Sequence, residues 1–274
     1  MSVTTYPTTA ALPVRTTNMT TNVSRILKGE WTKLRTLPST WRMAAFAFVF
    51  SIGAGAVLVV SQANQWATMT PEQHRTFDAT SCSLFGIMIA AVLLGSLAVR
   101  SVTAEYASGM IRSTFTAMPA RRLVLAAKAA TVAAFAFPVA LVSNFVGFDI
   151  GQRIFAGKHL QVALGHPGVL GAIFFGAVAV VSLIAVIGVG LGGVIRHTAG
   201  ATTAMAVVIV GGVTFGQLLP AAWRGYLPGT AIQAAVTVHR SPGILAPGTA
   251  ILVLAVYAAI TLAAASMRAA HRDA

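Results

Sequence analysis

Six long stretches of this 274-residue chain contain no Asp, Glu, Lys or Arg. These stretches are 43–71, 79–99, 129–148, 159–195, 197–223 and 241–267. A helix needs about 20 mostly apolar residues to cross the hydrocarbon core of a bilayer. A charged side chain at the centre of such a helix costs roughly 2.5–3.5 kcal/mol on insertion scales. The pattern therefore predicts an all-α, polytopic membrane protein with six transmembrane helices.

The overall composition agrees with this prediction. Hydrophobic residues make up 56% of the chain and charged residues only 9%, whereas a soluble domain carries about 25% charged residues. A soluble fold can bury one helix that is apolar on all sides, but it has no place for six of them.

The formal net charge of +13 indicates topology rather than nucleic-acid binding, because the basic residues are concentrated in particular loops. Fourteen of the nineteen Lys and Arg residues lie on one side of the predicted layout, in the N-terminal tail through Arg42, in segment 100–128, at Arg196 and in the C-terminal tail. Loops rich in Lys and Arg stay in the cytoplasm. We therefore expect a multi-pass protein of the cell membrane with both termini cytoplasmic and no nucleic-acid partner.

The chain divides into a tail, an interfacial helix and a membrane domain. Residues 1–21 are Thr-rich and are expected to form a disordered cytoplasmic tail. Residues 22–40 carry one apolar stripe with basic residues largely opposite, which is typical of an amphipathic helix lying in the membrane interface. Pro38 is expected to end or bend it. The six-span domain covers 41–268. A short cytoplasmic tail, 269–274, follows.

The predicted spans have approximate bounds that follow the charge-free stretches, and only the third begins earlier and includes a charge, Lys128. They are 43–62, 80–99, 125–147, 169–195, 199–219 and 248–267. Segment 220–247 contains four prolines but is rich in apolar residues, so we expect short re-entrant or interfacial helices there. The small-residue motifs Gly188-x-x-x-Gly192 and Gly212-x-x-x-Gly216 predict close helix packing, either within the chain or, less favoured, in a dimer seam.

No catalytic, cofactor or metal site is predicted in this chain. Gly188, Gly190 and Gly193 have dinucleotide-fingerprint spacing but lie inside a charge-free run, without the strand that the fingerprint requires. Segment 151–158 departs from the phosphate-binding loop in its glycine spacing and lacks Ser or Thr after its Lys. No two histidines have helical i, i+4 metal-ligand spacing, and Cys82 is the single cysteine.

The span centres lack the ionisable residues that ion-coupled carriers place at mid-membrane. Any energy for transport must then enter from outside the spans. Segment 100–128 is the most unusual polar stretch, because Glu105 is its only acidic residue and Gly109 and Pro119 interrupt it. It is either a docking surface for a cytoplasmic partner or a solvated basic loop that only sets topology.

Four segments resemble the membrane subunits (permeases) of type-2 ABC exporters, in the order and spacing of that family. They are Glu30 to Trp41, Glu105 to Arg112 with its continuation to Lys128, Gly190 to Ala201, and Tyr226 to Ala234. The resemblance extends over nearly the whole chain after residue 22.

The resemblance implies a permease that pairs with a second, identical or homologous permease and docks cytoplasmic ATPase subunits. Those partners would bind ATP, so this chain would hold no cofactor of its own. The cargo would be a small amphipathic or hydrophobic compound (a drug, antibiotic or lipid-like molecule) moved outward. By this analogy the ATPase-coupling region contains Glu105, Tyr106, Gly109, Arg112, Arg121 and Arg122. The interfacial helix contributes Glu30, Trp31, Lys33 and Arg35.

Two other classes of function compete with the exporter. A non-transporting membrane anchor or regulatory subunit would dock a cytoplasmic partner with the same layout. An intramembrane enzyme would need a polar catalytic cluster within the spans, and the sequence shows none.

Overall fold

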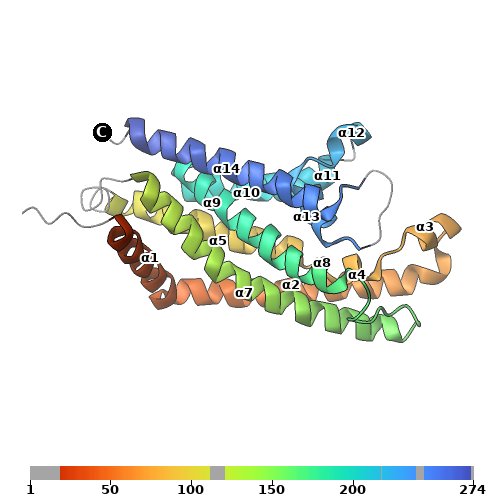
Figure 1. The fold of residues 1–274 in the computed structure, drawn as a ribbon. Coiled ribbons are helices and arrows are strands. Elements are labelled where there is room, and N and C mark those ends of the chain that lie inside the picture. Colours follow the sequence, from red (N-terminus) through yellow and green to blue (C-terminus); the bar gives the residue numbers. More distant parts are fainter. Residues whose placement is uncertain (1–18, 112–120, 217, 239–243, 273–274) are drawn as a thin grey trace, which may run out of the picture.

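A computed structural model describes residues 19–111, 121–216, 218–238 and 244–272. Within these ranges the regular structure is entirely helical, with no strand (Figure 1). The all-α prediction is therefore confirmed. Arg112 and Pro119 lie outside the described residues, as does most of the predicted N-terminal tail.

The first half of the chain forms α1 (Met19–Thr36), α2 (Pro38–Gln65), the 3₁₀ turn η1 (Trp66–Thr68), α3 (Pro71–Thr76), α4 (Ala79–Ser83), α5 (Ile87–Ala107) and α7 (Arg121–Ala156). The second half forms α8 (Val169–Phe175), the π-helical η2 (Gly176–Val181), α9 (Ser182–Ile195), α10 (Thr198–Ala206), the π-helical η3 (Val207–Gly211), α11 (Gly212–Gly216), α12 (Ala221–Arg224), α13 (Pro228–Val236) and α14 (Pro247–Arg272).

Five helical stretches are long and apolar enough to cross a membrane. They are Pro38–Thr68, Ile87–Ala107, Arg121–Ala156, Thr198–Gly216 and Pro247–Ala270. The remaining predicted span, 169–195, consists of α8, η2 and α9 in succession, and its uniform apolar α-helix, Ser182–Ile195, has 14 residues. Five candidate spans are thus found, and the sixth stays a prediction.

Several helices extend beyond the predicted spans. The third span was expected at 125–147, but α7 has 36 residues and continues through Pro138 to Ala156. Likewise α14 continues to Arg272, into the predicted tail. Expectations based on charge-free runs stop at the first charge, whereas a helix end can carry charges that are solvated or paired. Two short helices, α12 and α13, occupy the segment predicted to be re-entrant, and their placement in a membrane stays a prediction.

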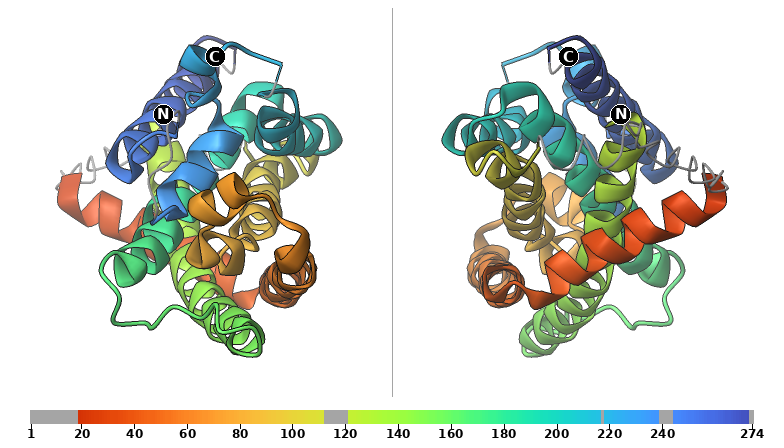
Figure 2. Two further views of the ribbon diagram at one scale, coloured as in Figure 1. Left: turned by 90° about the vertical axis from the view of Figure 1, so that its right-hand side faces the viewer. Right: turned by 90° about the vertical axis from the view of Figure 1, so that its left-hand side faces the viewer.

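The long helices run side by side, and α1 lies across one end of them (Figures 1 and 2). The same end holds the C-terminal end of α5, the start of α7, the α9–α10 turn and the end of α14, while α3 and α12 lie at the opposite end. The segments that the sequence assigns to the basic side are therefore gathered at one end of the bundle.

The corner between α1 and α2 follows from local sequence. Leu37 has an extended backbone (φ −81°, ψ 115°), and Pro38 occupies the first turn of α2, where its missing N–H costs nothing. The indole Nε1 of Trp41 donates a hydrogen bond to the carbonyl oxygen of Arg35 at 2.9 Å, which bridges the corner. The helix predicted over 22–40 is found as α1 over Met19–Thr36, and the expected end or bend at Pro38 corresponds to the break between α1 and α2.

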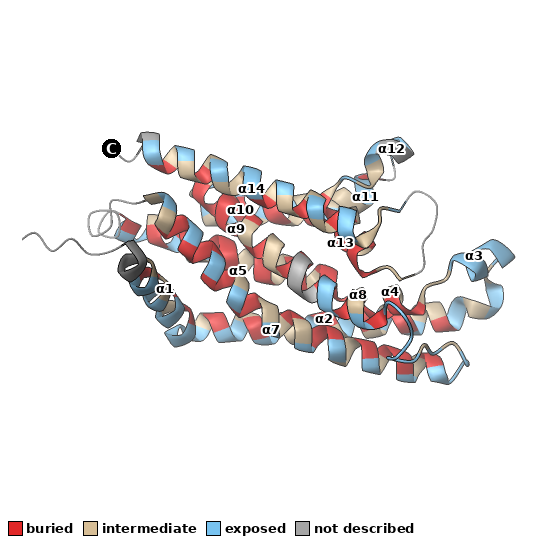
Figure 3. Ribbon diagram, viewed as in Figure 1, coloured by how far each residue is buried: buried red, intermediate tan, exposed pale blue. Residues whose placement is uncertain are grey.

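Helix α9 packs between α5 and α14 in the interior of the bundle (Figure 3). A Cβ atom at Gly188 would lie 2.6 Å from the carbonyl oxygen of Gly95, and one at Gly192 would lie 2.9 Å from that of Val99. Both glycines therefore allow α5 to approach α9 closely. The favoured prediction of packing within the chain is confirmed for this motif.

A second close approach gives a test of the fold. A methyl group at Gly86 would overlap the backbone carbonyl oxygen of Ser51 in α2. Gly86→Ala is expected to destabilise the protein by about 1–3 kcal/mol, because backbone atoms have to move. Gly53→Ala in α2 is the matched control, since a Cβ atom there meets nothing within 4 Å. Because glycine disfavours a helix, Gly53→Ala should leave the free energy of unfolding unchanged or raise it by roughly 0.5–1 kcal/mol. Equal melting temperatures for the two variants would contradict this packing.

Candidate functional site, a buried charge network between three helices

One face of α1 is buried against the bundle, and it carries a charge. Ile26, Glu30 and Leu34 recur every four residues and are all buried. Residues four apart lie on the same face of a helix. Glu30 therefore sits in the middle of an apolar stripe that packs on α7. Asp and Glu are almost never fully buried without a partner.

The partners of Glu30 come from three helices. In α1 itself, Lys33 Nζ lies 2.9 Å from Glu30 Oε1. The same Nζ lies 2.9 Å from Oε1 of Glu105, in the last turn of α5. Lys128 Nζ, from α7, lies 2.5 Å from Glu30 Oε2 and 2.9 Å from Glu105 Oε1. We call these four residues the charge network.

The charge network is neutral and largely enclosed. It contains two carboxylates and two ammonium groups. The Lys128, Glu105 and Glu30 side chains are 3%, 5% and 8% exposed, whereas Lys33 is 40% exposed. Charges interact more strongly in a low-dielectric interior than in water, and a buried charge that loses its partner is costly. The network therefore links the position of α1 to those of α5 and α7.

Local helix preferences do not explain where Glu105 lies. It falls in the last turn of α5, which ends at Ala107. The partial negative charge of a helix C-terminus disfavours an acidic side chain there, typically by 0.3–1 kcal/mol. Lys33 and Lys128 offset this cost across helix boundaries. Conflicts between local preference and position are expected at functional or strained sites.

The two residues of α1 have perturbed pKa values. Burial alone would raise the pKa of Glu30, but the charges and hydrogen bonds of Lys128 and Lys33 outweigh it and hold that pKa below the ordinary value of 4.5. Burial would lower the pKa of Lys33, but hydrogen bonds to Glu105 and Glu30 and their charges raise it above 10.5. Both shifts favour the charged forms.

These directions predict a pH window for the network. A lowered carboxyl pKa contributes stability that is complete above about pH 4.5 and is lost as pH falls through the folded-state pKa of Glu30. A raised lysine pKa contributes stability below about pH 10.5 that is lost as pH rises through the folded-state pKa of Lys33. Glu30→Gln should therefore melt below the wild type at pH 7, and the gap should close in acid. A gap that stays constant from pH 7 to about pH 3 would contradict the assignment.

Three other residues of the expected coupling region, Tyr106, Arg121 and Gly109, have local contacts or backbone geometry of their own. Arg196 places its guanidinium 4.9 Å from the centre of the Tyr106 ring, a cation–π distance. Arg121 Nη1 donates to the carbonyl oxygen of Ala269 at 2.7 Å, which joins α7 to α14. Gly109 has a positive φ of 72°, a conformation that favours glycine.

The remaining expected residues do not join the network. Trp31, Arg35 and Arg122 are exposed, and Trp31 contacts Phe135 edge-on at 6.5 Å between ring centres. The structure therefore brings together Glu30, Lys33 and Glu105 but not these three.

Lys128 was not among the expected site residues, although the sequence carried a signal for it. It follows Val124 and precedes Val132 by four residues each, and all three are buried on one face of α7. A lysine at the centre of an apolar helical stripe needs an acidic partner. Glu30 and Lys128 thus share one sequence signal, a charged residue in the middle of an apolar helical stripe.

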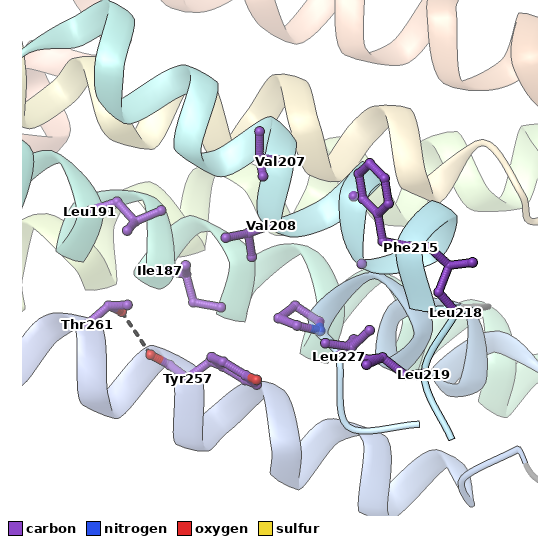
Figure 4. A pocket seen from close by; sticks show the side chains of 13 residues that line it. Ile187, Leu191, Val207, Val208, Phe215, Leu218, Leu219, Leu227, Tyr257 and Thr261 are labelled. Atoms are coloured by element: carbon purple, nitrogen blue, oxygen red, sulfur yellow. Dashed lines mark hydrogen bonds between the residues drawn. The ribbon is translucent and has the colours of Figure 1, made fainter. Parts of the chain in front are cut away.

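Two cavities accompany these elements. One, of about 600 Å³, is bordered by Glu30, Lys33, Glu105 and Lys128 and by the α1–α2 corner. The other, of about 540 Å³, is apolar and lies among α9, η3, α11 and α14, with Ile187, Leu191, Val207 and Phe215 in its wall (Figure 4). Tyr257 and Thr261 of α14 line its far side, and the Thr261 hydroxyl donates to the Tyr257 carbonyl at 2.9 Å.

Comparison with known proteins finds no matching protein-family model and no matching curated protein. Among the described residues, no group of three or more His, Cys, Asp or Glu side chains could hold a metal ion.

Proposed function

We propose that this chain is the permease subunit of an ATP-driven exporter of the type-2 ABC class. The observation that carries the proposal is the charge network, which joins the crossing helix α1 to two candidate spans at the basic end of the bundle. The four-segment resemblance to that class supports it, and so does the location of three resemblance residues (Glu30, Lys33 and Glu105) in one contact set.

In the proposed mechanism, α1 transmits the movement of the ATPase subunit to the helices of the bundle. The basic end of the bundle faces the cytoplasm by the distribution of Lys and Arg. A separate ATPase subunit docks there, binds ATP and shifts α1 together with the segment after Glu105. Because Lys33 and Lys128 each contact acids from two helices, a displacement of α1 displaces the ends of α5 and α7. A second permease copy or homologue completes the pathway.

The apolar cavity of Figure 4 supports a hydrophobic or amphipathic cargo. Its wall consists almost entirely of aliphatic and aromatic side chains, with Thr261 as one of its few polar members. Cavities of about 300–1,000 Å³ with mainly apolar walls are typical of small-molecule sites. A drug-like, antibiotic or lipid-like compound fits this chemistry.

Co-purification tests the proposal. We expect a tagged form of the full chain to retain a cytoplasmic ATPase with Walker motifs, encoded beside it, through solubilisation in mild detergent. The complex in liposomes should hydrolyse ATP faster than the ATPase alone, and Glu105→Gln should reduce that stimulation. Failure to retain any such ATPase would overturn the proposal.

The second candidate is a non-transporting anchor or regulatory subunit on the same fold. The charge network also suits a docking device, because a docked partner would benefit from a fixed α1, whereas the resemblance in four segments supports the exporter. It predicts a stable complex whose ATP hydrolysis neither depends on Glu105 nor moves any compound across the bilayer.

A further inference from the structure

The outward face of α1 carries three basic side chains in one narrow sector. Arg25, Lys28 and Arg35 are all exposed. With about 3.6 residues per turn, they lie within roughly 80° of one another around the helix axis. The middle of this sector points about 180° away from Glu30, which is buried against the bundle. We call Arg25, Lys28 and Arg35 the basic face of α1.

The side chains of the basic face are unpaired within the part of the chain that the structure describes. None of the three forms an ion pair or a side-chain hydrogen bond with a described residue. The inner face differs, because Lys33 there contacts two carboxylates. Like charges three or four residues apart, as at Arg25 and Lys28, slightly destabilise a helix. An anionic surface would remove this repulsion and is the complement of this face.

The apolar stripe of α1 is not available for insertion into a bilayer. The sequence predicts that this stripe lies in the membrane interface, but the structure packs it on the protein, where Ile26 and Leu34 are 7% and 6% exposed. The outward side consists of the basic face and of Trp31, which is 41% exposed. A helix whose apolar stripe is used within the protein holds a membrane surface chiefly through charge.

The connection to α2 places the basic face close to the hydrocarbon of a membrane. Only Leu37 separates α1 from α2, which is a candidate span. Phe46 and Phe50 of α2 are 56% and 57% exposed, and large apolar side chains exposed on a span face hydrocarbon. From Pro38 to Phe46 a helix advances about 12 Å. The basic face is therefore only a short distance from the acyl chains.

Trp41 marks the boundary between these two levels. It is 53% exposed and lies between α1 and the exposed phenylalanines of α2. Tryptophan is enriched where hydrocarbon meets head groups. The head-group region on each side of a bilayer is about 5–8 Å thick. The order along the chain thus places α1 at the level of the lipid head groups.

The direction of α1 favours lipid over a protein as the partner of the basic face. Viewed along the bundle, α1 runs across the ends of the long helices, and its beginning reaches past them (Figure 2). A helix in this position lies parallel to the bilayer surface and partly over the lipid beside the bundle. A protein docked on the end of the bundle would instead cover the helix ends.

We propose that the basic face of α1 binds the head groups of anionic phospholipids, such as phosphatidylglycerol, in the adjacent leaflet. The lipid phosphates accept hydrogen bonds from Arg25, Lys28 and Arg35. Because the charge network ties α1 to α5 and α7, anionic lipid adds to the contacts that hold α1 in place. The inference rests on the exposed face of α1 and on α2 as a candidate span, and not on the exporter proposal.

Tryptophan quenching by labelled lipid tests the proposal without a partner protein. The full chain carrying Trp66→Phe and Trp223→Phe retains Trp31 and Trp41 as its only tryptophans. It is placed in phosphatidylcholine nanodiscs that contain a small fraction of phosphatidylglycerol or phosphatidylcholine with a nitroxide on acyl carbon 5. We expect labelled phosphatidylglycerol to quench as if it were enriched about fivefold or more over its bulk fraction, which is the preference expected from one membrane-adjacent cation.

Neutralising the basic face should abolish this enrichment. The variant combines Arg25→Gln, Lys28→Gln and Arg35→Gln, and glutamine forms helix about as well as lysine and arginine. Its melting temperature should stay close to that of the parent, because all three side chains are exposed. Raising the salt concentration from 0.1 to 1 M, which shortens the Debye length from about 10 to about 3 Å, should weaken the enrichment in the parent chain.

The matched control removes the same charge far from α1. It neutralises three exposed cations towards the opposite end of the bundle, by Arg75→Gln, Arg153→Gln and Lys158→Gln. This control should keep the enrichment of phosphatidylglycerol, because its basic face is unchanged.

Three results would overturn the proposal. The first is equal quenching by the two labelled lipids in the parent chain. The second is an enrichment that survives neutralisation of the basic face or does not respond to salt. The third is an unchanged lipid environment together with loss of a co-purifying protein from the neutralised variant, which would assign the basic face to an acidic protein surface. Absence of an ATPase partner would contradict the exporter proposal but leave this measurement unaffected.

Discussion

Lys128→Met is expected to destabilise the protein by about 3–5 kcal/mol, the usual cost of removing one partner from a buried ion pair. The substitution keeps a side chain of similar length but leaves Glu30 and Glu105 with Lys33 as their shared cation. Lys33 is 40% exposed, so solvent screens its attraction for the two carboxylates and it compensates only partly for the lost lysine. The network would carry a net charge of −1 in a largely enclosed space.

Thermal unfolding in detergent, followed by tryptophan fluorescence, measures the effect. We expect the melting temperature of Lys128→Met to fall by roughly 10 °C or more. The matched control is Arg153→Met on the same helix, whose ion pair with Asp149 is exposed at both partners, by 78% and 60%. An exposed pair of this kind contributes little, so the control should melt close to the wild type. Equal losses in the two variants would contradict the buried network.

The spans could be predicted from sequence because the membrane imposes a simple requirement. Charges are excluded from hydrocarbon, so charge-free runs located the candidate spans at α2, α5, α7, α10–η3–α11 and α14. Their ends could not be read in the same way. Helix α7 contains Lys128 near one end and Arg153 near the other. The predicted span, 125–147, included Lys128 but stopped before Asp149, whereas α7 continues through the exposed Asp149–Arg153 pair to Ala156.

The candidate site was predicted in part. The family resemblance singled out Glu30, Lys33 and Glu105, but their meeting point depends on how three helices pack, which no local pattern specifies. The apolar residues spaced four apart around Glu30 and Lys128 are apparent in the sequence, and the structure buries them. They would have shown that each charge needs a partner. They would not have shown that the partner is shared.

Segment 220–247 and the two π-helical segments illustrate the same division. Four prolines correctly indicated that 220–247 does not form one long helix, and α12 and α13 are short. Two π-helical segments, η2 and η3, had no signal that a hydrophobic pattern could reveal. Such segments interrupt the regular helix and often occur at functional sites. Here η3 contributes Val207 and Val208 to the apolar cavity.

Neutralising one lysine and one glutamate of the charge network together should separate its effect on folding stability from its effect on coupling to the ATPase. Lys128→Met combined with Glu105→Gln removes one acid and one base, so the Glu30–Lys33 pair of α1 remains balanced. Replacing a whole buried ion pair with neutral groups is often close to neutral in stability. We therefore expect the double variant to regain most of the stability lost in Lys128→Met, in the manner of a coupled double-mutant cycle.

The same double variant should lose communication between α1 and the spans. Among the described residues, no ion pair would then join α1 to α5 or α7, because each of the pairs found there includes Glu105 or Lys128. With the proposed ATPase partner in liposomes, we expect stimulation of ATP hydrolysis to fall by about fivefold or more, the range of a coupling energy of 1–3 kcal/mol. Arg153→Met with Asp149→Asn, the paired neutralisation at the far end of α7, is the control and should leave stimulation unchanged. A stable double variant with normal stimulation would make the charge network a purely structural clamp, and the anchor or regulatory function would then be the better account.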